Sequence, residues 1–164
     1  MIPPTESAER VRALLAFFRE THYDAGMPDG AVVTLRVGEL PPSAISRWIG
    51  AGVAFYMTAC NPYSQAMSRE ENERRFAALR SDLQTGGARS LEGAGHIPGE
   101  RWREPSFLVA GLGLDAVDRL ARTYEQNALL VVEAGRPIRM RVYRPEWRKA
   151  AANAADIEWA PAVR

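Results

Sequence analysis

The residues best suited to chemistry gather where an apolar strand gives way to a helix. The segment from Thr58 to Ser64 follows a buried-looking strand at 53–59 and precedes a helix that Ser68 can cap. In open α/β sheets, ligands bind beyond the carboxyl ends of strands, where the next helix presents free N–H groups and a partial positive charge. The junction therefore predicts a pocket for a small anionic ligand, nucleotide-like or carboxylate-bearing, with Thr58, Asn61 and Ser64 as hydrogen-bonding groups.

The helix after the junction supplies a candidate charged wall. Its core-facing stripe is apolar: Phe76, Leu79 and Leu83. Asn72 and Arg75 fall on the same side of the helix, at the end nearest the junction. A stripe that turns polar beside a loop indicates a pocket edge, where Arg75 would offer a planar fork to a carboxylate or phosphate. The structural alternative stays open, because Asn61-Pro62 is a common turn starter and Arg75 can pair with Glu71.

Two carboxylates and two amides further along the chain are the remaining candidates. Glu92 and Glu104 bracket a Gly-rich stretch at 93–99, which could act as a lid. The two carboxylates could perform acid/base catalysis or hold a magnesium or calcium ion, although solvated surface carboxylates are the commoner case. Gln126 and Asn127 precede a buried strand, where they either cap a turn or face the pocket.

Cysteine and histidine chemistry is less well supported. Cys60, beside a helix N-terminus, could be a nucleophile, but such an enzyme needs a base, and the chain has only His22 and His96. A small buried hydrophobe is the usual fate of a free cysteine, and His22 fits a cap at the end of the first helix. One Cys and two His residues predict no zinc site, and no cofactor is indicated.

The elements that position these residues alternate between helix and strand. This alternation predicts an α/β fold, a single-layer mixed β-sheet flanked by helices with a C-terminal β-hairpin, in one domain. That domain would comprise an N-terminal helix (1–20), a core (21–143) and a peripheral helix or loose tail (144–164). The expected strands are 31–37, 53–59, 107–111, 128–132 and 138–143, with a short one at 88–91 in a Gly-rich connection, and the further helices are 43–48, 68–85 and 115–124.

Composition excludes several function classes. The 164 residues carry 21 basic and 20 acidic side chains, a net charge of +1, which gives no footprint for duplex nucleic acid or for a polybasic membrane contact. The start lacks the features of a signal peptide, and no apolar run reaches the roughly 18 residues that a membrane span needs. We therefore expect a cytoplasmic protein without a membrane partner, and a single cysteine agrees with a reducing compartment.

A second functional hypothesis is a non-catalytic interaction module. The alternation of Ile138, Met140 and Val142 indicates a half-exposed edge strand, which could pair with a partner or with a second copy of the chain. The tail with Trp147 and Trp159 is another candidate surface. Single-stranded nucleic-acid binding fits the balanced charge poorly.

The junction also resembles a known signature. The run Phe55-Tyr-Met-Thr-Ala-Cys-Asn-Pro-Tyr-Ser64 is similar to that of a bacterial family catalogued as domain of unknown function 3293, in which an aromatic-rich strand ends in a Thr-Ala-x-Asn-Pro-x-Ser turn. Further matches follow in order over about residues 20–143: Glu71-Asn72, Arg75, Leu79, Glu92-Gly93, Trp102, Glu104-Pro105-Ser106 and Gln126-Asn127-Ala128. The resemblance implies no established activity. Its recurrent polar positions coincide with the candidate site, and Cys60 stands at a variable position.

Overall fold

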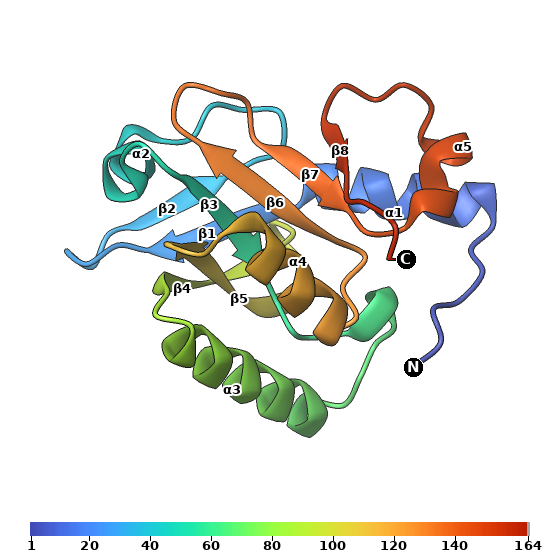
Figure 1. Ribbon diagram of the computed structural model, residues 1–164, viewed down its shortest axis with the longest axis horizontal. Helices are drawn as coiled ribbons and strands as arrows, with labels where there is room; N and C mark the ends of the chain where they lie inside the picture. Colours follow the sequence, from blue (N-terminus) through green and yellow to red (C-terminus); the bar gives the residue numbers. More distant parts are fainter. Residues whose placement is uncertain (164) are drawn as a thin grey trace.

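The apolar strand β3 (Val53–Met57) lies inside one eight-stranded sheet. The other strands are β1 (His22–Gly26), β2 (Val32–Leu35), β4 (Arg89–His96), β5 (Arg103–Ala110), β6 (Ala128–Glu133), β7 (Arg139–Val142) and β8 (Ile157–Trp159). Their order across the sheet is β2-β1-β4-β5-β3-β6-β7-β8, and only the β7–β8 pair is parallel (Figure 1). The structure, a computed structural model, describes residues 1–163.

Helices cover both faces of this sheet (Figure 1). Helix α1 (Ala8–Glu20) and helix α2 (Ser43–Ile49) pack on one core, whereas α3 (Arg69–Thr85) and α4 (Leu114–Thr123) pack on the other. The strands β3 and β6 contribute to both cores, which explains why they read as continuous apolar runs rather than alternating ones. The α/β prediction is confirmed: the sheet is single and mixed, helices flank it, and β6 with β7 forms the C-terminal hairpin.

The capping prediction for α3 is also confirmed. The Ser68 hydroxyl accepts a hydrogen bond from the Glu71 N–H at 3.1 Å, and Gly86 caps the other end. At the N-terminus of the chain, Ser7 caps α1 and the helix ends at Glu20. The cap role predicted for His22 is wrong, because this residue begins β1.

The Gly-rich connection predicted after α3 is instead a long strand, β4. Gly93 has to be a glycine there, because a Cβ atom would lie 1.7 Å from the backbone oxygen of Asp24 on the neighbouring strand β1. Glu92 and His96 therefore sit on a paired strand, and only residues 97–102 remain between β4 and β5. The predicted lid is wrong for residues 93–96.

The C-terminal segment closes the sheet beyond β7. Residues 144–163 form η2 (Pro145–Trp147), the short helix α5 (Arg148–Ala151) and β8, and Trp147 is fully buried. Since β7 pairs with β6 on one side and β8 on the other, the prediction of an exposed edge strand at Ile138–Tyr143 is wrong. The interaction module and the homo-oligomer contact inferred from that edge lose their basis.

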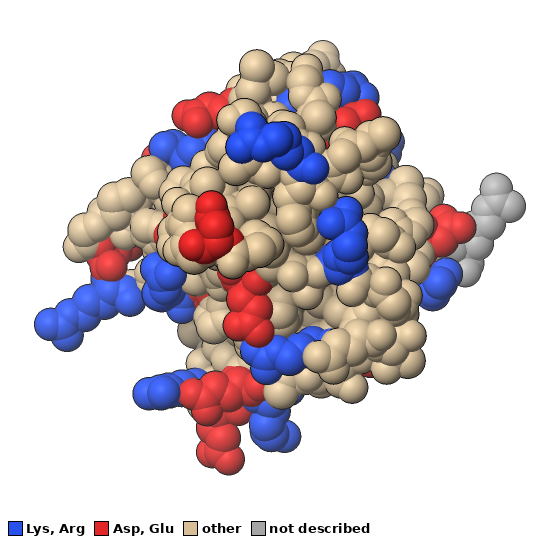
Figure 2. Space-filling view, turned by 90° about the vertical axis from the view of Figure 1, so that its left-hand side faces the viewer, with Lys and Arg blue, Asp and Glu red and all other residues tan. Residues whose placement is uncertain are grey.

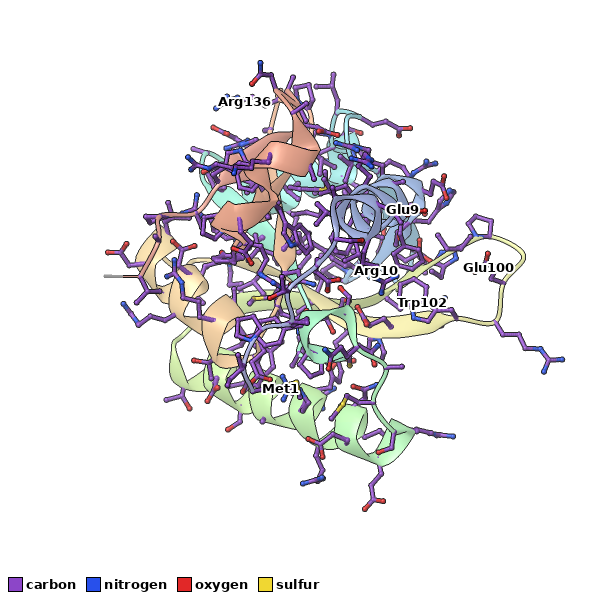
Figure 3. All side chains as sticks on the ribbon, turned by 90° about the vertical axis from the view of Figure 1, so that its right-hand side faces the viewer. Met1, Glu9, Arg10, Glu100, Trp102 and Arg136 are labelled. Atoms are coloured by element: carbon purple, nitrogen blue, oxygen red, sulfur yellow. The ribbon has the colours of Figure 1, made fainter. Side chains whose placement is uncertain are left out.

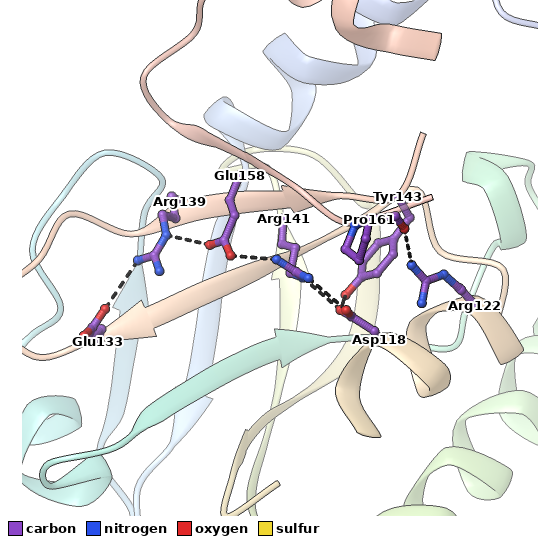
Figure 4. Close-up of polar contacts among 8 residues, drawn as sticks. All are labelled: Asp118, Arg122, Glu133, Arg139, Arg141, Tyr143, Glu158 and Pro161. Atoms are coloured by element: carbon purple, nitrogen blue, oxygen red, sulfur yellow. Dashed lines mark hydrogen bonds and ion pairs between the residues drawn. The ribbon is translucent and has the colours of Figure 1, made fainter. Parts of the chain in front are cut away.

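A ladder of charged side chains fastens β8 to β7 and α4 (Figure 4). Arg141 donates two 2.8 Å hydrogen bonds to Asp118 of α4 and one of 2.6 Å to Glu158 of β8. Arg139 continues the ladder to Glu158 at 2.8 Å, and the Tyr143 hydroxyl also donates to Asp118. The alternation of apolar residues with arginines in β7 predicted a solvent-exposed face. That face instead carries Arg139 and Arg141, which pair with carboxylates of α4 and β8.

The face of the molecule seen in Figure 2 has no large patch of one charge. Figure 2 shows basic and acidic side chains interspersed with uncharged ones on the face that carries α2 and the β1–β2 hairpin. Among residues 1–163, none of the helices has the length and apolarity that crossing a bilayer requires.

Candidate functional site

The junction after β3 is a strained loop. Asn61, Tyr63 and Ser64 have φ angles of 47°, 50° and 58°, a left-handed conformation that costs a non-glycine residue roughly 1 kcal/mol or more. Pro62 to Ser64 form the single turn η1 before α3. Strain of this kind persists only where neighbouring contacts enforce it.

The side chain of Asn61 supplies most of that enforcement. Its Oδ1 accepts hydrogen bonds from the Met67 N–H at 3.1 Å and from Asn72 Nδ2 at 2.9 Å. Its backbone N–H donates to Asn72 Oδ1 at 2.9 Å, so the two asparagines lock the loop to the first turns of α3. The Tyr63 N–H donates to the Glu125 carbonyl at 2.7 Å, which ties η1 to the end of α4.

Arg75 fastens the same loop from the other face of the sheet. Its Nε donates to the Ala59 carbonyl at 2.6 Å and its Nη2 to the Tyr124 carbonyl at 2.7 Å. A carboxylate oxygen of Glu125 lies 3.7 Å from Nη2. The guanidinium group is therefore engaged with the backbone of two connecting segments.

A cavity of about 380 Å³ opens on the opposite side of the sheet, beneath α1. We refer to it as the α1 cavity. Its lining comes from α1, six neighbouring strands (β1, β4, β5, β3, β6 and β7), the junction and the segments that flank these elements: Arg10, Ala13, Leu14, Phe17, Phe18, Thr21, Tyr23, Tyr56, Met57, Thr58, Asn61, Ser64, Ala66, Gly95, Trp102, Glu104, Ser106, Gln126, Asn127, Ala128, Leu129, Leu130 and Met140. Figure 3 shows Arg10 of α1 beside Trp102, at the start of β5, on one side of the molecule.

Aromatic rings form much of its wall. Phe17 of α1 meets Trp102 edge-to-face with ring centroids 4.9 Å apart, and Tyr23 meets Tyr56 in the same manner at 5.3 Å. Both tyrosine hydroxyls donate to backbone carbonyls, those of Phe18 and Asp24, at 2.8 and 2.6 Å. These rings consequently present their apolar surfaces to the cavity, while their polar tips are already satisfied.

Glu104 is the ionisable group at the polar end of the α1 cavity. Burial raises the pKa of its carboxyl to about 7, and the single opposing contact is a 2.6 Å hydrogen bond that Oε2 accepts from Asn61 Nδ2. The amide that enforces the strained loop thus also orients the carboxyl. A carboxyl with a pKa near 7 is populated in both protonation states at neutral pH, which suits proton transfer.

The other polar groups around Glu104 are held by the protein itself. Gln126 Nε2 donates to the carbonyls of Cys60 and Tyr124 at 3.0 and 2.9 Å. Asn127 Nδ2 donates to Ser64 Oγ at 2.9 Å. The rigid arrangement of these amides means that the polar end is preorganised rather than formed on binding.

The structure gathers six of the nine predicted site residues at this cavity: Thr58, Asn61, Ser64, Glu104, Gln126 and Asn127. Asn72 and Arg75 do not line the cavity, but both hydrogen-bond to the junction from α3, on the other face of the sheet. Glu92 points away from it, toward α3, where it pairs with Arg80 at 2.7 Å and is largely exposed. Glu92 and Glu104 therefore do not form a catalytic pair.

Cys60 is buried beside the junction. Burial raises the pKa of its thiol, which favours the protonated form over the nucleophilic thiolate. The Sγ atom faces two backbone carbonyls at 3.8 and 4.0 Å. These surroundings are those of a small core residue. Throughout residues 1–163, no three His, Cys, Asp or Glu side chains are grouped so as to hold a metal ion.

The sequence missed the whole α1 wall of the cavity. Arg10, Phe17 and Phe18 lie far from the junction in the chain, and they read there only as part of an amphipathic helix. Trp102 could be noticed in the sequence because it is one of the positions that resemble the family. Its distance from the junction along the chain gave no indication that the two line the same cavity. Tyr23 was hidden by the assignment of its segment to the end of a helix.

Comparison with known proteins finds a similarity to a protein family over part of the chain, and that similarity names no activity. Residues 57–129 match the model of a family described as "Protein of unknown function (DUF3293)". That segment runs from the last residue of β3 to the second residue of β6, and so contains the junction, α3 and Glu104. No curated protein and no solved structure matches the chain.

Proposed function

We propose that this chain, whose residues 57–129 match the model of the DUF3293 family of proteins of unknown function, binds a small and largely apolar molecule in the α1 cavity and exchanges a proton with it through Glu104. The observation that carries the proposal is a carboxyl group with a pKa near 7 at the end of an aromatic cavity. Cavities of a few hundred Å³ with few polar groups are typical small-molecule sites.

The proposed chemistry needs only the groups around Glu104. In its ionised form the carboxylate removes a proton from an O–H, N–H or activated C–H bond of the ligand, and in its protonated form it returns one. Asn61 holds the carboxyl in place through its 2.6 Å hydrogen bond, which favours the ionised form and fixes its direction. Ser64, held by Asn127, offers its hydroxyl to the ligand.

We keep the predicted location of the site and leave out the predicted anion. An anionic ligand depended on Arg75 and on the N-terminus of α3 at Ser68. Arg75 donates to two backbone carbonyls, and neither residue lines the α1 cavity. The helix that follows the junction packs on the other face of the sheet, so its positive end does not serve this pocket.

Blocking the cavity mouth tests the proposal. Ala13 is an exposed residue of α1 that lines the cavity, and Ala16 is an exposed residue of the same helix that does not. Apolar fragments that bind the wild-type protein in ligand-observed NMR should lose binding to Ala13→Trp and keep it with Ala16→Trp. Fragments that bind Ala13→Trp as well as wild type, or a wild-type protein that binds none, would refute the proposal.

A further inference from the structure

The charged side chains that line the α1 cavity are few, and they are not paired with each other. Arg10 and Glu104 are the charged members of its lining. Arg10 extends from α1 with about half of its side chain exposed, and its nearest carboxylate is Glu6 at 4.0 Å. The carboxyl of Glu104 has no cationic partner within residues 1–163, and a neutral amide is the group that stabilises its charge. Ionisation of a buried carboxyl group costs free energy when no cation lies beside it. A cation bound next to Glu104 would therefore stabilise its ionised form.

The hydrogen-bond donors at the polar end are largely spent. Gln126 uses both of its amide hydrogens on backbone carbonyls, and Thr58 donates its hydroxyl hydrogen to the Pro105 carbonyl at 2.7 Å. Ser106 donates to the Glu104 carbonyl at 3.1 Å. The amides of Asn61 and Asn127 have each used one of two hydrogens. Acceptors remain in excess, because both carboxylate oxygens have free lone pairs and Gln126 Oε1 accepts from none of residues 1–163.

We propose that the ligand carries a hydrogen-bond-donating cation, an amine or an amidine, which pairs with Glu104, on an aromatic or similarly flat apolar body. This inference rests on the proposed function and specifies its ligand class. An ammonium or amidinium group supplies the donors and the positive charge that the polar end lacks. The body lies in the cavity against the side chains of Phe17, Trp102 and Tyr56, which line it.

The ligand class also fits the proton transfer proposed for Glu104. A protonated amine that reaches the ionised carboxyl forms a charge-assisted hydrogen bond, along which the proton can pass from nitrogen to oxygen and back. Each transfer converts the ion pair into a neutral amine and a neutral carboxylic acid, so that charge is balanced without a further reactant. The neutral amine has a free electron pair.

Three probes with the same indole body and different head groups test the inference. Tryptamine carries an ammonium group, indole-3-ethanol a neutral hydroxyl group and indole-3-acetate a carboxylate. Titration of each into the full-length wild-type protein at pH 8, followed by protein-observed NMR, should show tryptamine binding about tenfold or more tightly than either of the others. Glu104→Gln should reduce tryptamine affinity to that of indole-3-ethanol, and Glu92→Gln, an exposed glutamate on the neighbouring strand, should not change it.

Lowering the pH provides an independent readout. Tryptamine affinity should fall between pH 8 and pH 5.5 as Glu104 takes up a proton, whereas indole-3-ethanol affinity should stay constant. Glu104 acts electrostatically on Tyr23 from β1 and Cys60 from the junction, and the other titratable or charged side chains that line the cavity are Tyr56 from β3 and Arg10 from α1. Burial raises the pKa of Tyr23, of Tyr56 and of Cys60, so all three stay neutral over this range.

The outcomes separate this inference from the proposed function. If indole-3-acetate or indole-3-ethanol binds at the α1 cavity as tightly as tryptamine, the ligand class is wrong and the cavity remains a binding site. If tryptamine binds tightly but Glu104→Gln leaves its affinity unchanged, the assigned ion pair is wrong. If the three probes shift no resonance of the cavity residues at millimolar concentration, both the ligand class and the binding function proposed for the cavity are refuted.

Discussion

Replacement of Glu104 by glutamine should make the protein more stable at neutral pH. Burial raises the pKa of the carboxyl from 4.5 to about 7, so between these two values the folded protein retains a proton that the unfolded chain has lost. Stability then falls as pH rises through this window, by about 3 kcal/mol in total, from 1.36 kcal/mol for each pH unit. Below pH 4.5 both states carry the proton, and the contribution of Glu104 is fully present.

Glutamine preserves the shape and the acceptor for Asn61 Nδ2 but cannot ionise. The difference in unfolding free energy between Glu104→Gln and wild type should therefore grow from pH 4.5 to pH 7 by up to about 3 kcal/mol, in favour of the variant, and then level off. Urea denaturation at half-unit pH intervals measures it, with Glu92→Gln as the control, since its exposed ion pair with Arg80 is worth under about 1 kcal/mol. A variant whose advantage is the same at pH 4.5 and pH 8 refutes the reasoning.

Three further substitutions test the scaffold around the site. Arg75→Ala removes hydrogen bonds to the carbonyls of Ala59 in the junction and Tyr124 after α4, and it should cost about 2–4 kcal/mol in urea denaturation, where a loss under 0.5 kcal/mol would contradict the structural role. Gly93→Ala places a Cβ atom 1.7 Å from the Asp24 oxygen and should leave no folded protein by circular dichroism, so a native spectrum would show that β1 and β4 are paired differently. Asp118→Ala removes two of the three hydrogen bonds that the buried Arg141 donates to carboxylates and leaves Glu158 as its acidic partner, so it should cost about 2–4 kcal/mol, against a small loss for exposed Asp115→Ala.

The sequence was most informative where a residue's role depends on its neighbours in the chain. Ser68 predicted the start of α3 because helix capping is local. The run Val53–Met57 predicted β3 because a strand buried on both faces has to be continuously apolar. The Asn61 loop was placed at the end of that strand for the same reason, since it follows the strand directly in the chain.

Local reasoning failed where distant segments decide the conformation. Glycines at 93 and 95 read as loop residues, but they permit close packing between strands: Gly93 faces the backbone of β1, and a Cβ at Gly95 would lie 3.3 Å from Thr21 and 3.6 Å from Trp102. The strand Arg139–Val142 read as an edge because its arginines alternate with apolar residues. Their acidic partners on α4 and β8 could not be paired with them by spacing alone.

The candidate site shows both behaviours at once. Arg75 was placed correctly at the end of α3 next to the junction, yet the cavity lies across the sheet from that helix. The polar end of the α3 stripe pointed to the C-terminal end of β3, which the α1 cavity adjoins. It placed the pocket on the α3 face of the sheet, whereas the cavity lies on the α1 face. Glu104 was a candidate because a carboxyl group can act as an acid or a base. Its raised pKa arises from burial in the fold, which the spacing of residues in the chain does not reveal.

The most direct test of the central claim is a ¹³C NMR titration of the Glu104 side-chain carboxyl in the wild-type protein, assigned with Glu104→Gln. The structure predicts a midpoint near pH 7, because the carboxyl faces an apolar cavity with a neutral amide as its partner. A midpoint near 4.5, the ordinary value for glutamate, would contradict the account, since the carboxyl would then be a solvated surface group and the α1 cavity would hold no group suited to proton exchange at neutral pH.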